Sequence, residues 1–379
     1  MVDDGWRRRM WPPLRVESGE LLHLDLLRFV ASVGVVLCHS GEFLLPRGAI
    51  REDLRASLGS LGLFVDTFFV VSGFVISWIY AERLNGLKAY GVFLHRRLAR
   101  LLPLHWLTLA IAFMLYFALT TLHMPLNTQP SLSASCVTTA ALLIHSMVGC
   151  GGMALNNVSW SISAELAMYV LFPLFFVIVQ RGFLAGLLLS AALAGAVLVW
   201  RGPSFGGWAA YLDVGRAFPA FTFGMTLYVG RGVIARLPAP RYGMAACAVL
   251  ILASPIFRAP DSLVLVAAYL VTPFAVAADM RGDAPASVRR TAPLGQLTYS
   301  IYMIHGLVIM TLVNGVGDKL LKLPQLAMIT LALAGWGVIG MISYGSFFWF
   351  EQPLRRRLNR LGARGLPLVR PAIGTVRNP

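Results

Sequence analysis

Long apolar stretches follow one another along the chain, separated by short polar or basic segments. A membrane-spanning helix needs about 20 apolar residues to cross a bilayer. The apolar stretches predict ten spans, at 22–45, 60–81, 102–123, 158–180, 183–200, 214–231, 242–257, 263–280, 293–316 and 326–350. A further apolar segment, 132–148, is short and rich in Ser and Thr, so we expect a re-entrant or interfacial helix there. If that segment did span, every later crossing would be inverted.

The composition agrees with this pattern. Hydrophobic residues make up 57% of the 379 residues and charged residues 13%, whereas soluble domains carry about 25% charge. The mean hydropathy of +0.71 also excludes a disordered chain. We therefore expect an all-α integral membrane protein, a single polytopic bundle of about ten transmembrane helices. The membrane domain should occupy residues 21–357, with cytoplasmic tails at 1–20 and 358–379.

The net charge of +15 would suggest a nucleic-acid partner in a soluble protein. Membrane proteins instead keep Lys and Arg on the cytoplasmic side. Ten spans with the N-terminus inside place 23 of the 32 Lys and Arg residues inside and 8 outside, with one within the first helix. The charge therefore predicts that both termini are cytoplasmic, and that the basic residues face anionic lipid rather than nucleic acid.

The four cysteines have neither CxxC nor metal-site spacing, and no metal is implied. Cys38 and Cys247 lie in apolar runs, where we expect them to pack. Cys136 and Cys150 share one loop, so a disulfide can form between them if that loop is periplasmic.

The first predicted helix carries two ionisable residues, Arg28 and His39. Ten residues lie between them, and this step of eleven positions places them about 20° from the same helix face and about 16 Å apart along the axis. Ionisable groups within a span are costly, which makes them candidates for function. One interpretation is a cation facing a donor from inside and a base facing an acceptor from outside. The other is a snorkelling arginine and a histidine that only forms hydrogen bonds.

A basic segment precedes the third predicted span, which we expect to begin near Pro103. Arg97 and Arg100 are three residues apart and share one helix face. Such a pair can bind phosphate groups through bidentate contacts. It can equally anchor the helix at an anionic lipid surface, and spacing does not decide between the two.

The fourth predicted span opens with a polar stripe formed by Ser161, Glu165 and Tyr169, spaced four residues apart. Glu165 and His39 lie at similar depths in the predicted topology. A carboxylate that orients a histidine sets its tautomer and basicity, so we expect Glu165 to pair with His39. The alternative is a carboxylate that stabilises the helix N-terminus.

The second span contains Asp66, which needs a partner within the membrane. An Arg or His from another helix is one such partner, and the role of Asp66 is then structural. Ser72 and Gly73 follow one turn or more later, and small residues there permit close helix approach.

The last two spans hold further polar residues. Tyr302 and His305 are three residues apart on one face, and an isolated histidine such as His305 is more often structural than catalytic. Glu351 ends the tenth span just before an arginine cluster. We expect it to form a structural ion pair with Arg356 or Arg357.

Taken together, these segments resemble acyltransferase family 3 of membrane acyltransferases. The residues that carry the resemblance occur in family order over 21–357: Arg28 and His39 ten residues apart, VDTFFVVSGF at 65–74, Arg97 and Arg100 before a proline, Trp160, Ser161 and Glu165 leading to Phe172-Pro173, Ser300, Tyr302 and His305, and Glu351 with Pro353. Each motif is weak alone, and the ordered set is specific. The sequence departs from the family at Leu26 and Phe29, often Gly, at Leu166, often acidic, and at Gly306, where a nearby proline is usual.

The resemblance implies transfer of an acyl group, commonly acetyl, from cytoplasmic acyl-CoA to a hydroxyl of a cell-surface or exported glycan, including lipid-linked sugars. It also implies location in the bacterial inner membrane, with acyl-CoA as a co-substrate and no permanently bound cofactor. The site it implies assigns the phosphates of acyl-CoA to Arg97 and Arg100, and its pantetheine arm to Arg28. His39 is then the general base and Glu165 orients it, while a covalent acyl-histidine intermediate remains open. Asp66, Ser72, Trp160, Ser161, Tyr302, His305 and Glu351 are the supporting residues.

Two rival interpretations remain open from the sequence. Some relatives act on small molecules such as macrolides. Buried ionisable residues also mark transport paths, so a glycolipid or polysaccharide transporter is the alternative from another class. The chain shows no inverted repeat and no paired broken helices, which argues against a transporter.

Overall fold

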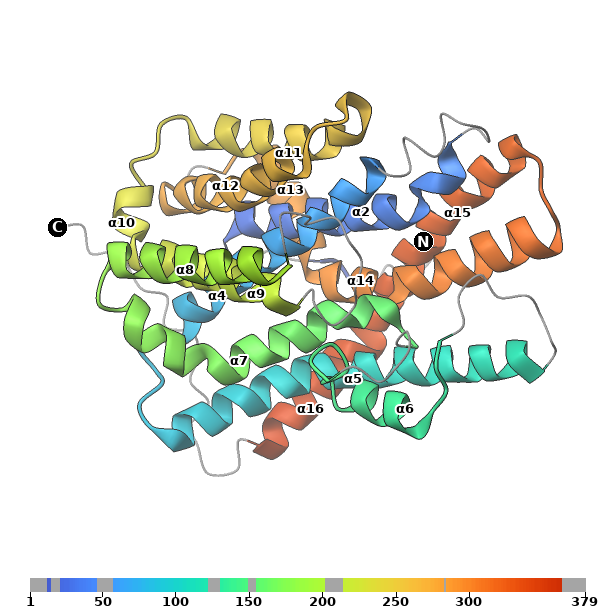
Figure 1. The fold of residues 1–379 in the computed structure, drawn as a ribbon, viewed down its shortest axis with the longest axis horizontal. Helices are drawn as coiled ribbons and strands as arrows, with labels where there is room; N and C mark the ends of the chain where they lie inside the picture. Colours follow the sequence, from blue (N-terminus) through green and yellow to red (C-terminus); the bar gives the residue numbers. More distant parts are fainter. Residues whose placement is uncertain are drawn as a thin grey trace, which may run out of the picture.

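The computed structural model describes residues 12–14, 21–45, 57–121, 130–148, 155–201, 214–282 and 284–362. Over this part of the chain, the regular elements are all helical, with no β-strand. Figure 1 shows the long helices packed side by side, most with their axes along the long direction of the molecule. The predicted all-α polytopic bundle is confirmed.

Nine segments among the described residues are long and apolar enough to cross a membrane. Five of them are single helices: α2 (Leu22–Leu44), α5 (Leu87–Thr121), α8 (Phe183–Arg201), α11 (Pro240–Phe257) and α12 (Asp261–Met280). Two combine a short helix with a long one: η1 (Gly59–Leu63) with α4 (Phe64–Tyr80), and η2 (Asn157–Ser159) with α7 (Trp160–Val179). The last two are longer composites: α13 (Ala286–Thr291), η3 (Ala292–Leu297), α14 (Thr298–Val308) and η4 (Ile309–Leu320) form one, and α15 (Gln325–Gly345), η5 (Ser346–Glu351) and α16 (Gln352–Gly362) form the other. The predicted sixth span, 214–231, corresponds to α9 (Val214–Val229). That helix has 16 described residues, fewer than a full crossing needs.

The segment 132–148 does not form a span, as the sequence predicts. Its helix α6 (Ala134–Ala141) has eight residues. Eight residues extend about 12 Å, against about 30 Å of hydrocarbon. The helix packs on α5, where His105 Nε2 donates to the carbonyl of Ala140 at 2.8 Å and Trp106 Nε1 to that of Ala141 at 2.9 Å.

The helix that contains the predicted third span begins well before Pro103. Helix α5 runs without a break from Leu87 to Thr121, with Pro103 inside it rather than at its start. A proline removes one backbone hydrogen bond, and the neighbouring helices compensate for this loss within a bundle. Nearby, Tyr299 donates its hydroxyl to the carbonyl of Leu101 at 2.5 Å. Arg97 and Arg100 therefore lie on the same continuous helix as the span itself.

Helix α4 lies at the centre of the bundle and packs most closely on α9. A Cβ atom on Gly73 would lie 2.0 Å from the carbonyl oxygen of Phe221, and one on Gly224 would lie 2.0 Å from that of Val70. The two backbones approach so closely that only glycine fits at either position. The close approach predicted at Gly73 is thus confirmed, and it fixes the depth of Ser72 beside it.

Helix α2 is fixed at its N-terminus by Asp279 from the end of α12. The carboxylate of Asp279 accepts the backbone N–H of His23 at 2.8 Å and of Leu24 at 3.1 Å, and the His23 ring at 2.8 Å. Orphan N–H groups at a helix start need such partners. This cap holds the part of α2 that carries Arg28.

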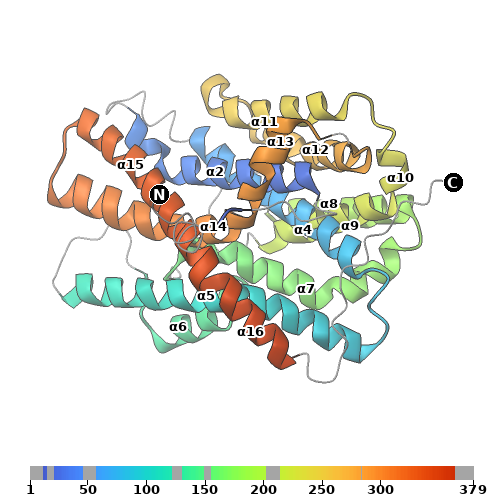
Figure 2. The same ribbon diagram turned by 180° about the vertical axis from the view of Figure 1, so that it is seen from behind.

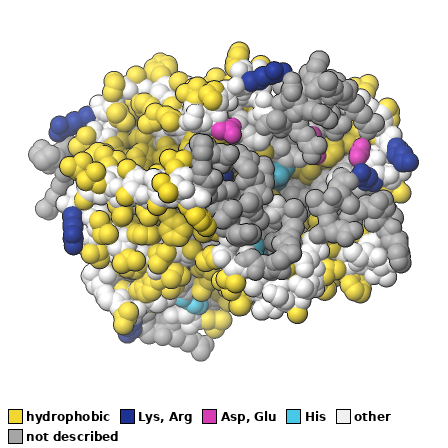
Figure 3. All heavy atoms as spheres, in the orientation of Figure 1, with side chains coloured by type: hydrophobic (Ala, Val, Ile, Leu, Met, Phe, Trp, Pro, Cys, Tyr) yellow, Lys and Arg dark blue, Asp and Glu magenta, His cyan; other side chains and the backbone are white. Residues whose placement is uncertain are grey.

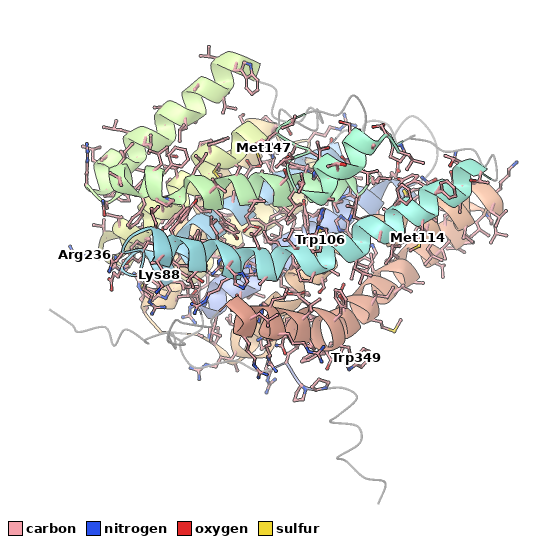
Figure 4. The ribbon with its side chains drawn as sticks, turned by 90° about the horizontal axis from the view of Figure 1, so that it is seen from below. Lys88, Trp106, Met114, Met147, Arg236 and Trp349 are labelled. Carbon is pink, nitrogen blue, oxygen red and sulfur yellow. The ribbon has the colours of Figure 1, made fainter. Side chains whose placement is uncertain are left out.

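Charged side chains gather at the ends of the bundle. Figure 4 places Lys88 and Arg236 at the same end, with Met114 far along α5 from Lys88. Figure 3 shows apolar side chains over much of one face, with Lys and Arg towards its margins. Seen from behind in Figure 2, the basic helix α16 crosses α5, and His95 Nε2 donates to the carbonyl of Leu358 at 3.0 Å. The face seen in Figure 3 thus combines a broad apolar area with basic residues near its margins, a distribution typical of membrane proteins.

Candidate active site

A cavity of about 90 Å³ lies between α2, α4, α5, α7 and α14. Residues from five separate sequence motifs line it, among them Arg28, Ser72, Arg97, Arg100, Glu165 and Tyr302. The structure therefore brings most of the predicted site together. Most of the other lining residues are apolar or aromatic, such as Phe68 and Val75, together with the hydroxyl-bearing Ser161 and Thr298.

Arg97 is the most deeply buried cation of the cavity, with 8% of its surface exposed. Its Nη2 donates to the hydroxyl of Tyr80 at 3.0 Å, and its guanidinium carbon lies 4.9 Å from the centre of the Tyr80 ring and 5.8 Å from that of Tyr169. Its Nε is buried and has no hydrogen-bond partner among the described residues. None of the described carboxylates forms an ion pair with it. Aromatic rings thus hold the guanidinium while part of its donor capacity stays unused.

Further arginines lie near Arg97. Arg97 and Arg100 both line the cavity, as their shared helix face predicts. Arg28 lies within electrostatic range of Arg100, and its contact with Asp25 is long, at 3.4 Å. Arg355 of α16 lies within range of both Arg97 and Arg100. Two carboxylates lie within electrostatic range of this group: Glu165 near Arg28 and Arg97, and Glu351 near Arg28, Arg100 and Arg355. They offset part of the repulsion among the four cations, which still outnumber them.

Glu165 does not pair with His39. The Oε1 atom of Glu165 accepts the hydroxyl of Ser72 at 2.6 Å and that of Tyr169 at 2.5 Å. Ser161, Glu165 and Tyr169 line the cavity together, so the predicted polar stripe is confirmed while the predicted partner is wrong. The reason is the rotation of α7, which turns this stripe towards α4 and α5.

His39 instead contacts His305. The Nδ1 atom of His39 lies 2.9 Å from the carbonyl oxygen of Val35 and 3.3 Å from Nε2 of His305, and the ring centres are 5.0 Å apart. His39 is not among the cavity-lining residues. Tyr302 lies between the cavity and the histidine pair, because it lines the cavity and its ring centre lies 5.6 Å from that of His305. Ser161 holds Tyr302 in place by donating to its hydroxyl at 2.7 Å.

Asp66 forms a buried ion pair with Arg216 of α9, a partner of the kind that the structural interpretation of Asp66 predicts. Its carboxylate accepts both Nε, at 3.3 Å, and Nη2 of Arg216. The guanidinium lies 6.0 Å from the ring of Trp160, which packs against this pair and does not line the cavity. Asp66 is likewise absent from the cavity wall.

Glu351 does not form the predicted ion pair with Arg356 or Arg357. It is 2% exposed and accepts the hydroxyl of Ser300 at 2.9 Å. Arg356 instead donates to the side chain of Gln352 at 3.0 Å. The helix continues through Glu351 into α16, and this turns Glu351 inward while Arg356 and Arg357 remain exposed.

Cys136 is disulfide-bonded, whereas Cys38 and Cys247 are free thiols. Cys150, the partner predicted from the sequence, lies outside the described residues. No three His, Cys, Asp or Glu side chains in the described part of the chain are grouped to hold a metal ion.

Sequence reasoning missed three residues around the site. Tyr80 holds Arg97, Arg216 holds Asp66, and Arg355 joins the arginine group. The signal for Arg216 was present, because a cation in an apolar helix needs a partner. The contacts of Tyr80 and Arg355 depend on how α4, α5 and α16 pack, and spacing along the chain does not show this.

Comparisons with known proteins agree with the resemblance seen in the motifs. The acyltransferase MdmB of Streptomyces mycarofaciens is 30% identical over 164 residues, which cover 41% of this chain and 39% of that protein. Protein 2 in the picA locus of Rhizobium radiobacter is 36% identical over 103 residues, or 27% of this chain and 49% of that protein. The matches thus span less than half the length of these curated relatives, and no solved structure matches. The model of an acyltransferase domain matches residues 21–350, and on this match the chain belongs to acyltransferase family 3.

Proposed function

We propose that the protein is a membrane O-acyltransferase that moves an acyl group, acetyl in the simplest case, from cytoplasmic acyl-CoA to a hydroxyl of a cell-surface or exported glycan. The observation that carries this proposal is the position of Arg97. A buried guanidinium with no ion-pair partner among the described residues lines the same cavity as Tyr302, whose ring centre lies 5.6 Å from that of His305. Such an arrangement suits an anionic donor that delivers its reactive end towards His39.

The arginines are the donor site in this proposal. Arg97 and Arg100 bind the phosphates of acyl-CoA, since a planar guanidinium forms paired hydrogen bonds with phosphate oxygens. Arg28 attracts the pantetheine arm towards the bundle interior. The mutual repulsion of these cations falls when the donor binds. Membrane lipid is the surrounding solvent, and nucleic acid has no part in the proposal.

The cavity is narrow, and this favours an extended arm over a bulky ring. With about 90 Å³ of space, it accepts a slender chain more readily than a sugar. Tyr302 and Phe68 line it, with their ring centres 5.9 Å apart and edge to face. The thioester passes these two rings to reach His39, while the glycan hydroxyl approaches from the other side.

His39 is the general base of the proposed reaction. The acceptor hydroxyl loses its proton to His39 as its oxygen forms the new ester bond with the thioester carbonyl carbon. The carbon–sulfur bond then breaks, and the sulfur leaves with the proton that His39 held, as free CoA. Glu165 has a different role from the one predicted. It fixes Ser72 and Tyr169, and the ring of Tyr169 in turn supports Arg97.

The end of the bundle that carries Lys88 and Arg236 is cytoplasmic in this proposal, which places the protein in the bacterial inner membrane. The excess of Lys and Arg in the loops predicted to lie inside supports this orientation. The disulfide at Cys136, beyond the predicted outer end of α5, supports it as well, because disulfides persist in oxidising compartments.

Cysteine labelling tests the orientation. In a background with Cys38 and Cys247 replaced by serine, a single cysteine at 124–131 should react with an impermeant maleimide from outside. One at 285–288 should react only after the membrane is opened. The reverse pattern at 285–288 would overturn the proposed orientation.

Reconstituted transfer tests the function itself. Proteoliposomes receive radiolabelled acyl-CoA and a panel of surface glycans, and both CoA release and glycan labelling are measured. His39→Ala should insert and fold but lose about 10²–10⁴-fold in transfer. His95→Ala, on α5 outside the cavity, is the matched control and should retain activity. Transfer by His39→Ala at the wild-type rate would reject His39 as the base, and glycan movement without thioester cleavage would favour a transporter.

A further inference from the structure

The contacts of the His39–His305 pair indicate which nitrogen of each ring carries a proton. His305 is fully buried, whereas His39 is partly exposed, and the two rings come from different helices, α14 and α2. Among the described residues, hydrogen-bond contacts join His39 Nδ1 with the carbonyl of Val35, His305 Nδ1 with the carbonyl of Ile301, and His305 Nε2 with His39 Nδ1. These contacts together determine where the protons are.

The contact with Val35 assigns the tautomer of His39. A carbonyl oxygen only accepts hydrogen bonds, so the Nδ1 atom 2.9 Å from it must carry the proton. In the neutral ring, the lone pair is then on Nε2. That nitrogen is the one that can take a proton from a substrate hydroxyl.

The same reasoning assigns His305. Its Nδ1 lies 3.2 Å from the carbonyl oxygen of Ile301, so Nδ1 is the donor and Nε2 carries the lone pair. This lone pair lies 3.3 Å from His39 Nδ1, which shares its proton between Val35 and His305. One arrangement of protons thus satisfies all three contacts without a charged ring.

We propose that His305 is a positioning residue that fixes the Nδ1–H tautomer of His39 and stabilises its protonated form during transfer. This inference rests on the proposed role of His39 as base. When His39 takes a proton at Nε2, its Nδ1–H becomes a stronger donor, and the neutral His305 accepts it. A neutral imidazole thereby has the place that a carboxylate occupies in the Ser-His-Asp arrangement. Glu165, the residue the sequence suggests for this role, faces the cavity instead.

The neighbours of His305 also hold its orientation. Tyr302, one turn earlier on α14, has its ring centre 5.6 Å from that of His305. The ring centre of His39 lies 5.0 Å from that of His305, which is fully buried. Burial between these neighbours restricts the rotamers of His305, as a positioning residue requires.

Two amide variants separate positioning from packing. In His305→Gln, the side-chain oxygen reaches the place of Nε2 and still accepts the His39 proton. In His305→Asn, the amide reaches only the place of Nδ1, so it is polar and compact but leaves His39 unsupported. We expect kcat to fall at least about tenfold in His305→Asn and to recover largely in His305→Gln, with donor and acceptor KM little changed in both. Thermal unfolding in detergent, measured in parallel, reports packing.

The double variants separate this inference from the proposed function. In a His39→Ala background, His305→Asn should cause no further loss, because the residue it positions is gone. Equal kcat for His305→Asn and wild type would overturn the inference, and so would equal losses in the Asn and Gln variants. Full additivity with His39→Ala would overturn it too. Wild-type transfer by His39→Ala alone would instead reject the proposed base, whatever the His305 variants do.

Discussion

Arg97 and Arg216 are equally buried, each with 8% of its surface exposed, yet their surroundings differ completely. Arg216 forms a two-point ion pair with Asp66 between α9 and α4. Arg97 has a tyrosine hydroxyl, two further aromatic faces and an unused Nε. The protein thus compensates one buried charge within its own fold and leaves the other to be completed.

The two arginines also differ in whether they line the cavity. Asp66 does not line the cavity, and the Asp66–Arg216 pair packs beneath Trp160. Arg97 lies on the cavity wall with Arg100, and Arg355 lies within electrostatic range of both. Desolvating an unpaired cation costs several kcal/mol, so a fold keeps one where a ligand repays that cost. The comparison teaches that burial alone does not single out an arginine for function. Burial beside a cavity, without an ion-pair partner among the described residues, is what makes Arg97 the candidate for ligand binding.

The largest expected effect is the loss of Arg216. Arg216→Leu leaves the carboxylate of Asp66 buried and unpaired, which should cost about 3–5 kcal/mol of stability. Thermal unfolding of the purified protein in detergent measures this. The double variant Asp66→Asn/Arg216→Leu should recover most of the loss, because no charge is left uncompensated. If Arg216→Leu proves no less stable than Arg97→Leu, the contrast between the two arginines is wrong.

Donor binding should stabilise the protein through Arg97 and not through Arg216. At a concentration 100 times its dissociation constant, a ligand adds about 2.7 kcal/mol of stability. CoA should therefore raise the unfolding temperature of the wild type and of the Asp66→Asn/Arg216→Leu variant, but much less that of Arg97→Leu. Inorganic phosphate serves as the control for a simple anion effect. An equal shift in all three proteins would show that CoA binds elsewhere.

The geometry of Arg97 should matter beyond its charge. Arg97→Lys keeps a cation but loses the planar fork, so a phosphate site should weaken by about 1–3 kcal/mol. We expect a raised KM for acyl-CoA, little change in the acceptor KM, and a similar result for Arg100→Lys. Arg96→Lys, one residue away and outside the cavity wall, is the matched control. A lipid anchor tolerates lysine, so wild-type kinetics in both Arg97→Lys and Arg100→Lys would assign the pair to lipid anchoring.

The hydrophobic pattern predicted the architecture because crossing a bilayer requires long apolar helices. It placed the spans, and it separated the short segment at α6 from them. It did not predict that α5 continues through Pro103, because a proline that ends an isolated helix is tolerated inside a bundle. Nor did it predict the π-helical segments η4 and η5, which depend on packing against neighbouring helices.

For the candidate site, the sequence predicted which residues share a helix face, but it did not predict which faces pack against one another. Arg97 and Arg100 share a face, and so do Ser161, Glu165 and Tyr169, because helical periodicity fixes this. Which faces meet depends on how each helix is rotated about its axis, and one sequence does not contain that information. For this reason Glu165 was assigned to His39 in error, while His305, expected to be structural, is the residue in contact with it.

The smallest expected effect concerns the hydroxyl that holds Arg97. Tyr80→Phe removes the hydrogen bond to Nη2 but keeps the ring that lies against the guanidinium. One hydrogen bond contributes about 0.5–1.5 kcal/mol, so the KM for acyl-CoA should rise roughly two- to tenfold at constant kcat. Tyr90→Phe is the matched control, since the hydroxyl of Tyr90 donates to the carbonyl of Val170 and the residue does not line the cavity. If stacking alone positions Arg97, both phenylalanine variants will match the wild type. If the hydroxyl aims the guanidinium, only Tyr80→Phe will weaken donor use, and combining it with Arg97→Lys will add little because both changes act on the same contact.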